Sequence, residues 1–238
     1  MKNLVLILLA GFLLWGCEES TDPTPSTGTI AGTVKLSKAD NNDYSGVEVL
    51  LNGPPYSTTS RTNGAWELTD VPAGVYKVDF NKLGYFTKTF YNFQFVGSGT
   101  YYFSTYTLSK VPSERVTQLN VQVNDTTSVY FSGLISPPVK SQQNVILLLS
   151  KSPLTRTIPI EAFDFSVFGA SAGQYEYGIY YTTEWHPEIS TGDTLYAVTF
   201  LGDEQFIGVS YNPINDTYIY NTPGGEGLLS NVVSVIVP

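Results

Sequence analysis

The only histidine in the chain, His186, lies in the segment Glu184-Trp185-His186-Pro187-Glu188. In an extended chain, Glu184, His186 and Glu188 would share one face, and imidazole and carboxylate groups are ligands that zinc accepts. Pro187 disrupts a regular strand, however, and an isolated match without supporting ligands is a weak signal. We therefore expect an exposed acidic loop at this position, with no metal and no other cofactor.

Other catalytic patterns are weak in the sequence. A serine hydrolase of the nucleophile-elbow type would need a histidine partner and a Gly-x-Ser-x-Gly segment that runs from a strand into a helix. Residues 169–173 (GASAG) match the letters of that segment, but no helical pattern follows them. A glycosidase needs two placed carboxylates, and nothing in the sequence marks a pair among the twelve acidic residues of 111–238. We expect a protein that is not an enzyme, with a glycan-active enzyme as the least favoured alternative.

Aromatic residues offer a binding chemistry instead. Tyr180, Tyr181 and Trp185 cluster where a predicted strand runs into a loop. Flat aromatic rings at such a position can stack on the apolar faces of sugars, while polar rims bind the hydroxyl groups. The alternative is a half-buried strand in which the tyrosines fill a core. Because neighbouring strand residues face opposite sides, at least one of Tyr180 and Tyr181 should face solvent. These three residues are the candidate ligand-binding patch.

The single cysteine, Cys17, follows one lysine and an apolar run from Leu4 to Gly16. This layout is typical of a secretory signal peptide and is too short to span a bilayer. The segment Leu14-Trp15-Gly16-Cys17 resembles the lipobox of bacterial lipoproteins, although Trp15 is bulkier than the usual residue. The resemblance implies that residues 1–16 are removed and that Cys17 is acylated. The alternative is an uncleaved hydrophobic tail with an incidental cysteine.

Residues 17–27 are acidic and then rich in Pro, Ser and Thr, which predicts an extended tether. The pair Glu18-Glu19 is similar to the surface-export signals of Bacteroidetes lipoproteins. Together with the lipobox, this pair predicts that the protein is an outer-membrane lipoprotein of the cell envelope, facing the surface or the periplasm. The expected membrane contact is the lipid on Cys17.

The charge is distributed unevenly along the chain. Residues 28–110 contain 7 Lys and Arg against 6 Asp and Glu, whereas residues 111–238 contain 4 against 12. The difference predicts a domain boundary at 110/111, within a segment that carries Pro112. A net charge of −8 on the second part argues against nucleic acid as a partner, because binding to nucleic acid depends on neutralising phosphates.

Short alternating runs between turn residues fill both parts, which predicts an all-β protein with two consecutive β-sandwich domains. In residues 28–110, Val47, Val49 and Leu51 alternate and should point into one core. In residues 111–238, the continuous apolar run in 144–150 predicts a buried central strand.

Five segments of the first part occur in a recognisable order: residues 32–34 (GTV), 46–51 (GVEVLL), 62–68 (TNGAWEL), 71–78 (VPAGVYKV) and 83–85 (LGY). This order resembles the carboxypeptidase regulatory-like domain, over residues 29–109. The resemblance implies a transthyretin-like, carbohydrate-binding-like β-sandwich without catalytic residues of its own, used as a structural or binding module.

The C-terminal strands of the second part, residues 192–198 and 229–235, resemble those of a fibronectin type III-like or Ig-like sandwich. The connection from Gly202 to Leu229 is long for that fold. The whole pattern predicts a non-catalytic, membrane-anchored structural or protein-interaction module at the cell surface. A carbohydrate-binding surface lipoprotein is the alternative. The expected partners are accordingly a cell-envelope protein or a polysaccharide.

Overall fold

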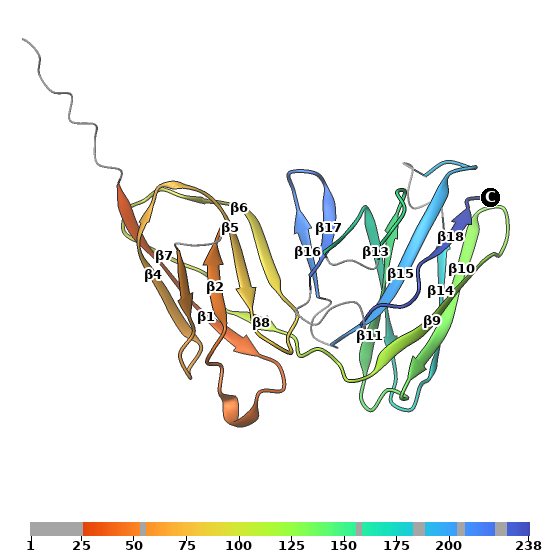
Figure 1. The fold of residues 1–238 in the computed structure, drawn as a ribbon, viewed down its shortest axis with the longest axis horizontal. Helices are drawn as coiled ribbons and strands as arrows, with labels where there is room; N and C mark the ends of the chain where they lie inside the picture. The colour runs from red at the N-terminus through yellow and green to blue at the C-terminus, as the bar shows by residue number, and fades with distance from the viewer. Residues whose placement is uncertain (1–25, 53–55, 156–158, 183–188, 204–207, 222–227) are drawn as a thin grey trace, which may run out of the picture.

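The computed structural model describes residues 26–238, apart from 53–55, 156–158, 183–188, 204–207 and 222–227. The protein is built from β-strands, which confirms the predicted all-β fold, and Asp40–Asn42 forms a short 3-10 turn. Figure 1 shows two β-sandwich units that follow one another along the chain. Within the described ranges, no helix is long and apolar enough to cross a membrane. Cys17, the proposed signal peptide and nearly all of the tether lie outside those ranges.

The first unit packs two sheets around one core. One sheet has the order β4-β1-β7, with β8 also paired to β1, and the other has the order β3-β2-β5-β6. The strands are β1 (Thr27–Leu36), β2 (Glu48–Leu51), β3 (Ser57–Thr59), β4 (Ala65–Pro72), β5 (Gly74–Asn81), β6 (Lys88–Phe95), β7 (Thr100–Tyr102) and β8 (Tyr106–Leu108).

The alternation seen in the sequence sets the core of the first unit. Val47, Val49 and Leu51 are buried, as predicted, beside Trp66 and Phe80. The Trp66 and Phe80 rings meet edge to face at 5.5 Å, a geometry that aromatic pairs favour. The core therefore follows from period-two patterning on both sheets.

The second unit contains three sheets, with the orders β14-β10-β9, β13-β11-β15-β18 and β12-β17-β16. The strands are β9 (Arg115–Val123), β10 (Ser128–Ser136), β11 (Gln143–Ser150), β12 (Ile160–Ala162), β13 (Asp164–Ala170), β14 (Glu176–Thr182), β15 (Thr194–Asp203), β16 (Val209–Asn212), β17 (Thr217–Tyr220) and β18 (Val233–Ile236).

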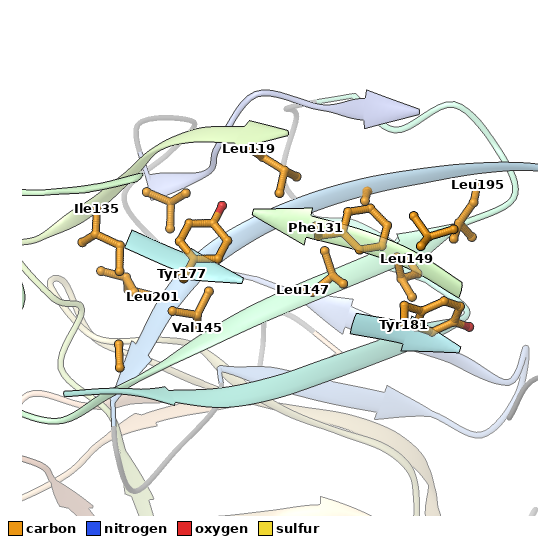
Figure 2. Packing of buried hydrophobic residues seen from close by; sticks show 14 of the residues in the cluster. Leu119, Phe131, Ile135, Val145, Leu147, Leu149, Tyr177, Tyr181, Leu195 and Leu201 are labelled. Carbon is orange, nitrogen blue, oxygen red and sulfur yellow. The ribbon is translucent and has the colours of Figure 1, made fainter. Parts of the chain in front are cut away.

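Strand β11 is buried on both faces, as its unbroken apolar run predicts. Val145, Leu147 and Leu149 point into the core shared with β14-β10-β9, part of which Figure 2 shows. Ile146 and Leu148 point the other way, into a second core. A strand that is buried on both faces has no place for alternating polar residues, which explains its composition.

The second core is closed by the sheet β12-β17-β16. Strands β16 and β17 form an antiparallel hairpin inside the connection from Gly202 to Leu229 that the sequence left without strands. Val209 and Tyr220 from this hairpin are buried, and the Tyr220 ring stacks on Phe200 at 3.8 Å. The hairpin strands are four residues each, too short for a clear alternating pattern, so sequence analysis missed them.

Phe86 connects the two units. It belongs to the turn between β5 and β6 of the first unit, yet it is only 1% exposed and lies in the second core. Its ring centroid is 6.1 Å from that of Phe200 and 5.9 Å from that of Tyr220. The backbone of the same turn is fixed to the boundary segment, since Phe86 N–H donates to Ser109 O and Val111 N–H donates to Gly84 O, each at 2.9 Å.

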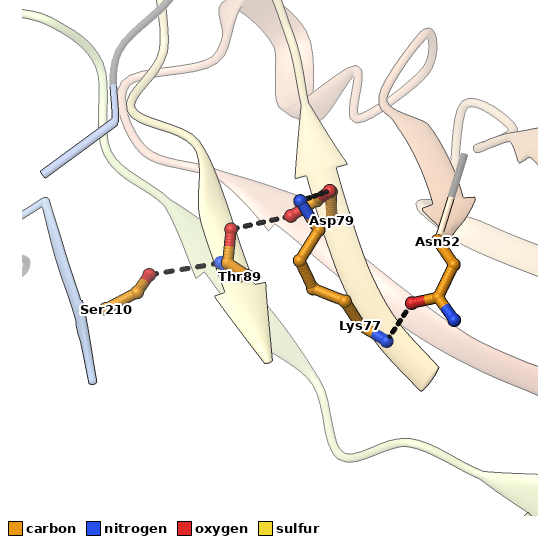
Figure 3. A network of polar contacts seen from close by, with 5 residues as sticks. All are labelled: Asn52, Lys77, Asp79, Thr89 and Ser210. Carbon is orange, nitrogen blue, oxygen red and sulfur yellow. Dashed lines mark hydrogen bonds and ion pairs between the residues drawn. The ribbon is translucent and has the colours of Figure 1, made fainter. Parts of the chain in front are cut away.

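Polar contacts continue across the junction (Figure 3). Thr89 N–H on β6 donates to Ser210 Oγ on β16 at 3.1 Å, and Thr89 Oγ1 donates to Asp79 Oδ1 at 2.7 Å. Asp79 in turn forms an ion pair of 2.8 Å with Lys77. Strand β6 is the edge of its sheet, so the Thr89 N–H has no neighbouring strand to bond to on that side. The Ser210 hydroxyl accepts this hydrogen bond in place of solvent.

Replacing Phe86 with Ala should destabilise the second core although Phe86 belongs to the first unit. Truncation of a buried phenylalanine removes apolar contacts and leaves a cavity, so we expect a loss of about 3–5 kcal/mol in the free energy of unfolding. Urea denaturation followed by circular dichroism measures it. Leu83→Ala is the matched control, since Leu83 lies in the same turn and is 87% exposed. An equal loss in both variants would contradict the role of Phe86.

Acid should weaken the boundary through Glu114, which is buried just before β9. Burial by itself would raise the pKa of this carboxyl, but hydrogen bonds from its own backbone N–H, Gln143 and Ser113 outweigh that effect and lower the pKa. A lowered folded-state pKa gives stability that is present above the unfolded-state value of about 4.5 and is lost as pH falls through the folded-state value.

Glu114→Gln removes this titration. We expect the stability of the variant, measured by urea denaturation between pH 7 and pH 3, to fall less steeply below about pH 4.5 than that of the unaltered chain. Parallel pH profiles for the two proteins would show that Glu114 contributes nothing to acid sensitivity.

Candidate functional site

The outer face of the sheet β14-β10-β9 carries a group of side chains that could bind a ligand. Along β10, Val129 and Phe131 point into the core, so Tyr130 and Ser132, which alternate with them, point outward. The strand order places β10 in the middle, between β9 and β14. Outward residues of all three strands therefore meet on one surface, which we call the outer face.

The register of the strands decides which residues are neighbours on the outer face. Ser132 pairs with Asn120 on β9 and with Gly178 on β14. Leu134, two residues further, pairs with Gln118 and Glu176. Residues far apart in the sequence, from 118 to 178, are thus brought into one cluster.

Tyr130 lies against the sheet because the neighbouring strand has a glycine. A Cβ atom at Gly178 would lie 2.0 Å from the Tyr130 hydroxyl oxygen and 2.7 Å from the ring carbon that bears it. The ring therefore crosses onto β14 and rests over Gly178, and Tyr130 is half-buried. This arrangement lays an aromatic ring on a surface whose other outward side chains are polar, apart from Leu134.

The outer face is supported from beneath by Tyr177. Its hydroxyl donates to the backbone oxygen of Gln118 at 2.9 Å and shares a hydrogen bond of 2.8 Å with Thr199 Oγ1 on the facing sheet. A Cβ at Gly133 would lie 2.4 Å from that hydroxyl, so Gly133 leaves the path open. Burial raises the pKa of the Tyr177 phenol, although its hydrogen bond with Thr199 opposes the shift. The phenol therefore stays neutral and holds the two sheets together.

A depression of about 500 Å³ follows the outer face. The side chains that could contact a ligand there are Gln118, Asn120, Tyr130, Ser132, Gln174 and Glu176. Amides, a hydroxyl and a carboxylate offer both donors and acceptors around one ring. Such a surface can bind a polyhydroxylated molecule by stacking and hydrogen bonding, and its only carboxylate among the described lining residues is Glu176.

The residues predicted from sequence fall in different places. Tyr181 is 1% exposed and belongs to the core between the two large sheets, so its proposed role as a ligand-binding residue is corrected to a core role. Alternation along a strand puts one of two adjacent tyrosines on the inner side of the sheet, but the sequence pattern does not say which one. The backbone of Tyr180 pairs with that of Tyr130 on β10, and its side chain lies outside the described part.

Trp185 and the segment around His186 also lie outside the described residues, so the predictions about them stay predictions. Within the described part, no three His, Cys, Asp or Glu side chains come together as a metal-binding group. Sequence analysis missed Tyr130, Gly178 and Glu176. The alternation around Tyr130 is visible in the sequence, but its position over Gly178 depends on the pairing of β10 with β14.

Comparisons with known proteins gave structural likeness only. No protein-family model matches the chain, and no curated protein matches it by sequence. Among solved structures, a DUF3823 family protein from Parabacteroides merdae is 14% identical, with 89% of this chain and 100% of that chain covered and a TM-score of 0.34. A candidate carbohydrate-binding protein from Bacteroides uniformis is also 14% identical, with coverage of 89% and 99% and a TM-score of 0.32.

A type II cohesin-X-dockerin complex from Acetivibrio cellulolyticus is 22% identical over 35% of this chain, with a TM-score of 0.32. The matched region spans 58% of that chain, less than two thirds of its length. At these identities and scores, the likeness carries no argument about ligand or activity, and the function is inferred from the outer face itself.

Gly178→Ala tests the placement of the Tyr130 ring. The added methyl occupies the space of the ring end, so we expect the ring to turn away from β14 at a cost of about 1–3 kcal/mol in unfolding free energy. Urea denaturation measures the cost, and NMR shifts of the Tyr130 ring report its displacement. Gly169→Ala is the control, because the nearest atom to its Cβ would be 3.7 Å away. Unchanged Tyr130 shifts in Gly178→Ala would contradict the placement.

Proposed function

We propose that this chain is a non-catalytic, lipid-anchored binding protein of the cell envelope, and that its outer face binds carbohydrate. The observation that carries the proposal is the Tyr130 ring resting over Gly178 with amide, hydroxyl and carboxylate groups beside it. The flat faces of many sugar rings are apolar C–H surfaces, and their rims are hydroxyl groups. One aromatic ring with polar neighbours on a sheet matches both features.

Anchoring is proposed from the N-terminal sequence. A lipid on Cys17 followed by residues 18–26 would tether β1 to a membrane, and these nine residues of extended chain reach about 30 Å. Membrane attachment by acyl chains depends on the number of buried CH₂ groups, and several chains on one cysteine give a stable anchor. The outer face, on the second unit, would then be held at the membrane with the first unit between it and the anchor.

The structural or protein-interaction role remains the second candidate, and the junction between the units favours it. Phe86 is buried inside the second unit, and Thr89 donates a hydrogen bond to Ser210 across the boundary. These contacts would keep the first unit in one orientation against the second. The first unit, which resembles a carboxypeptidase regulatory-like domain, would then act as a spacer that carries the second unit away from the anchor.

A glycan array tests the carbohydrate role. Residues 20–238, which include every described residue, would be applied with three single variants alongside. We expect binding by the unaltered chain and a loss of up to about tenfold in Tyr130→Ala, since an aromatic contact typically contributes about 0.5–1.5 kcal/mol. Tyr102→Ala is the control, because Tyr102 is 74% exposed on the first unit, away from the outer face.

Trp185→Ala separates the two candidate carbohydrate surfaces. Loss of binding in Trp185→Ala alone would move the site to the loop segment predicted from sequence. An array that stays blank for the unaltered chain would reject the carbohydrate role and leave the spacer and protein-interaction role.

Lipidation is tested in a bacterial host by Cys17→Ala in the full chain. We expect the unaltered protein to incorporate labelled palmitate and to sediment with membranes, and the variant to do neither, because no other cysteine is available. Equal incorporation of label in both proteins would contradict acylation at Cys17.

A further inference from the structure

The charge of the outer face points to a class of carbohydrate. We infer that the outer face selects uncharged polysaccharide and rejects uronic acid and sulfated chains, an inference that rests on the proposed carbohydrate function. Among the described residues that line the depression, Glu176 is the one charged group, and none is Lys, Arg or His. An anionic sugar would therefore meet a carboxylate and no compensating cation.

The polar groups of the outer face suit hydroxyl groups. Gln118 Nε2 donates to Asn120 Oδ1 at 3.1 Å, which orients the two amides and leaves the other amide oxygen and nitrogen for a ligand. Gln174 donates to the backbone oxygen of Glu176, so its contact holds the strand end while the Glu176 carboxylate stays exposed. An ionised carboxylate accepts hydrogen bonds from sugar hydroxyls more strongly than a neutral oxygen does.

The charge of the whole second unit acts in the same direction. Residues 111–238 contain 12 acidic against 4 basic residues, so a polyanion approaching the outer face is repelled before it makes contact. A neutral chain is not affected. Its binding should depend little on ionic strength, whereas any residual binding of a polyanion should rise as salt screens the repulsion.

The shape of the outer face favours the interior of a chain over its end. The depression lies along the outward residues of three adjacent strands, which together span roughly 10 Å. The surface is a sheet face with no closed end wall formed by the described lining residues. An extended stretch of a linear polysaccharide can therefore lie across it.

The test compares binding of residues 20–238 to two sets of soluble polysaccharides by affinity electrophoresis. The neutral set contains a β-glucan, a mannan and a xylan, and the acidic set contains a polyuronate and heparin. We expect retardation by at least one neutral polymer and none by the acidic set at low salt. Glu176→Gln should weaken neutral binding about tenfold, since a charge-assisted acceptor becomes a neutral one.

A charge reversal gives the sharper result. Glu176→Lys should gain binding to the polyuronate while losing affinity for the neutral polymer. Glu67→Lys is the matched control, because it makes the same change in net charge at an exposed position on β4 of the first unit. The control variant should bind both sets of polymers as the unaltered chain does.

The outcomes separate the two levels of the proposal. Binding of the unaltered chain to the polyuronate or to heparin, abolished by Tyr130→Ala, would overturn the selectivity and leave the carbohydrate function standing. If Glu176→Lys and Glu67→Lys gained the same binding to the polyuronate, the net charge of the protein and not the outer face would determine selectivity. That result would also overturn the inference. Retardation by neither set would reject the carbohydrate function itself.

Discussion

Burial of β11 and β15 on both faces is the constraint on which the rest of the second unit depends. A sheet with apolar residues on two sides needs two covering layers. On one side, β14-β10-β9 supplies the cover, and on the other, the small sheet β12-β17-β16 supplies it together with Phe86. The second core is therefore complete only when the first unit is present, which ties the stability of one sandwich to a residue of the other.

The candidate site depends on the same arrangement. The inner side of β14-β10-β9 is fixed to the central sheet by Phe131, Tyr181 and the hydrogen bond between Tyr177 and Thr199. A sheet held so firmly can present outward side chains in fixed positions, which reduces the entropy that a ligand must overcome on binding. The position of the Tyr130 ring over Gly178 is thus a property of the packed sandwich and not of β10 alone.

Much of the fold follows from the sequence. Period-two alternation identified the core residues Val47, Val49 and Leu51, and the apolar run in β11 identified a strand buried on both sides. The hairpin β16–β17 could not be found in this way, because four-residue strands give too few alternations to stand out from a loop. The prediction that Tyr181 binds a ligand is wrong because the sequence pattern does not distinguish two adjacent tyrosines. Packing against the central sheet determines that Tyr181 is the one inside.

The sequence by itself determined the all-β class, the uneven charge of the two parts and the alternation that turns Tyr130 away from the core. Only the tertiary structure decided which strands are neighbours, and hence that Gly178 lies beside Tyr130 and that Phe86 enters the second unit. The physical reason is the sequence separation of the residues that interact. Patterning within one strand is set by local backbone geometry, whereas register and docking are set by contacts between segments far apart in the chain.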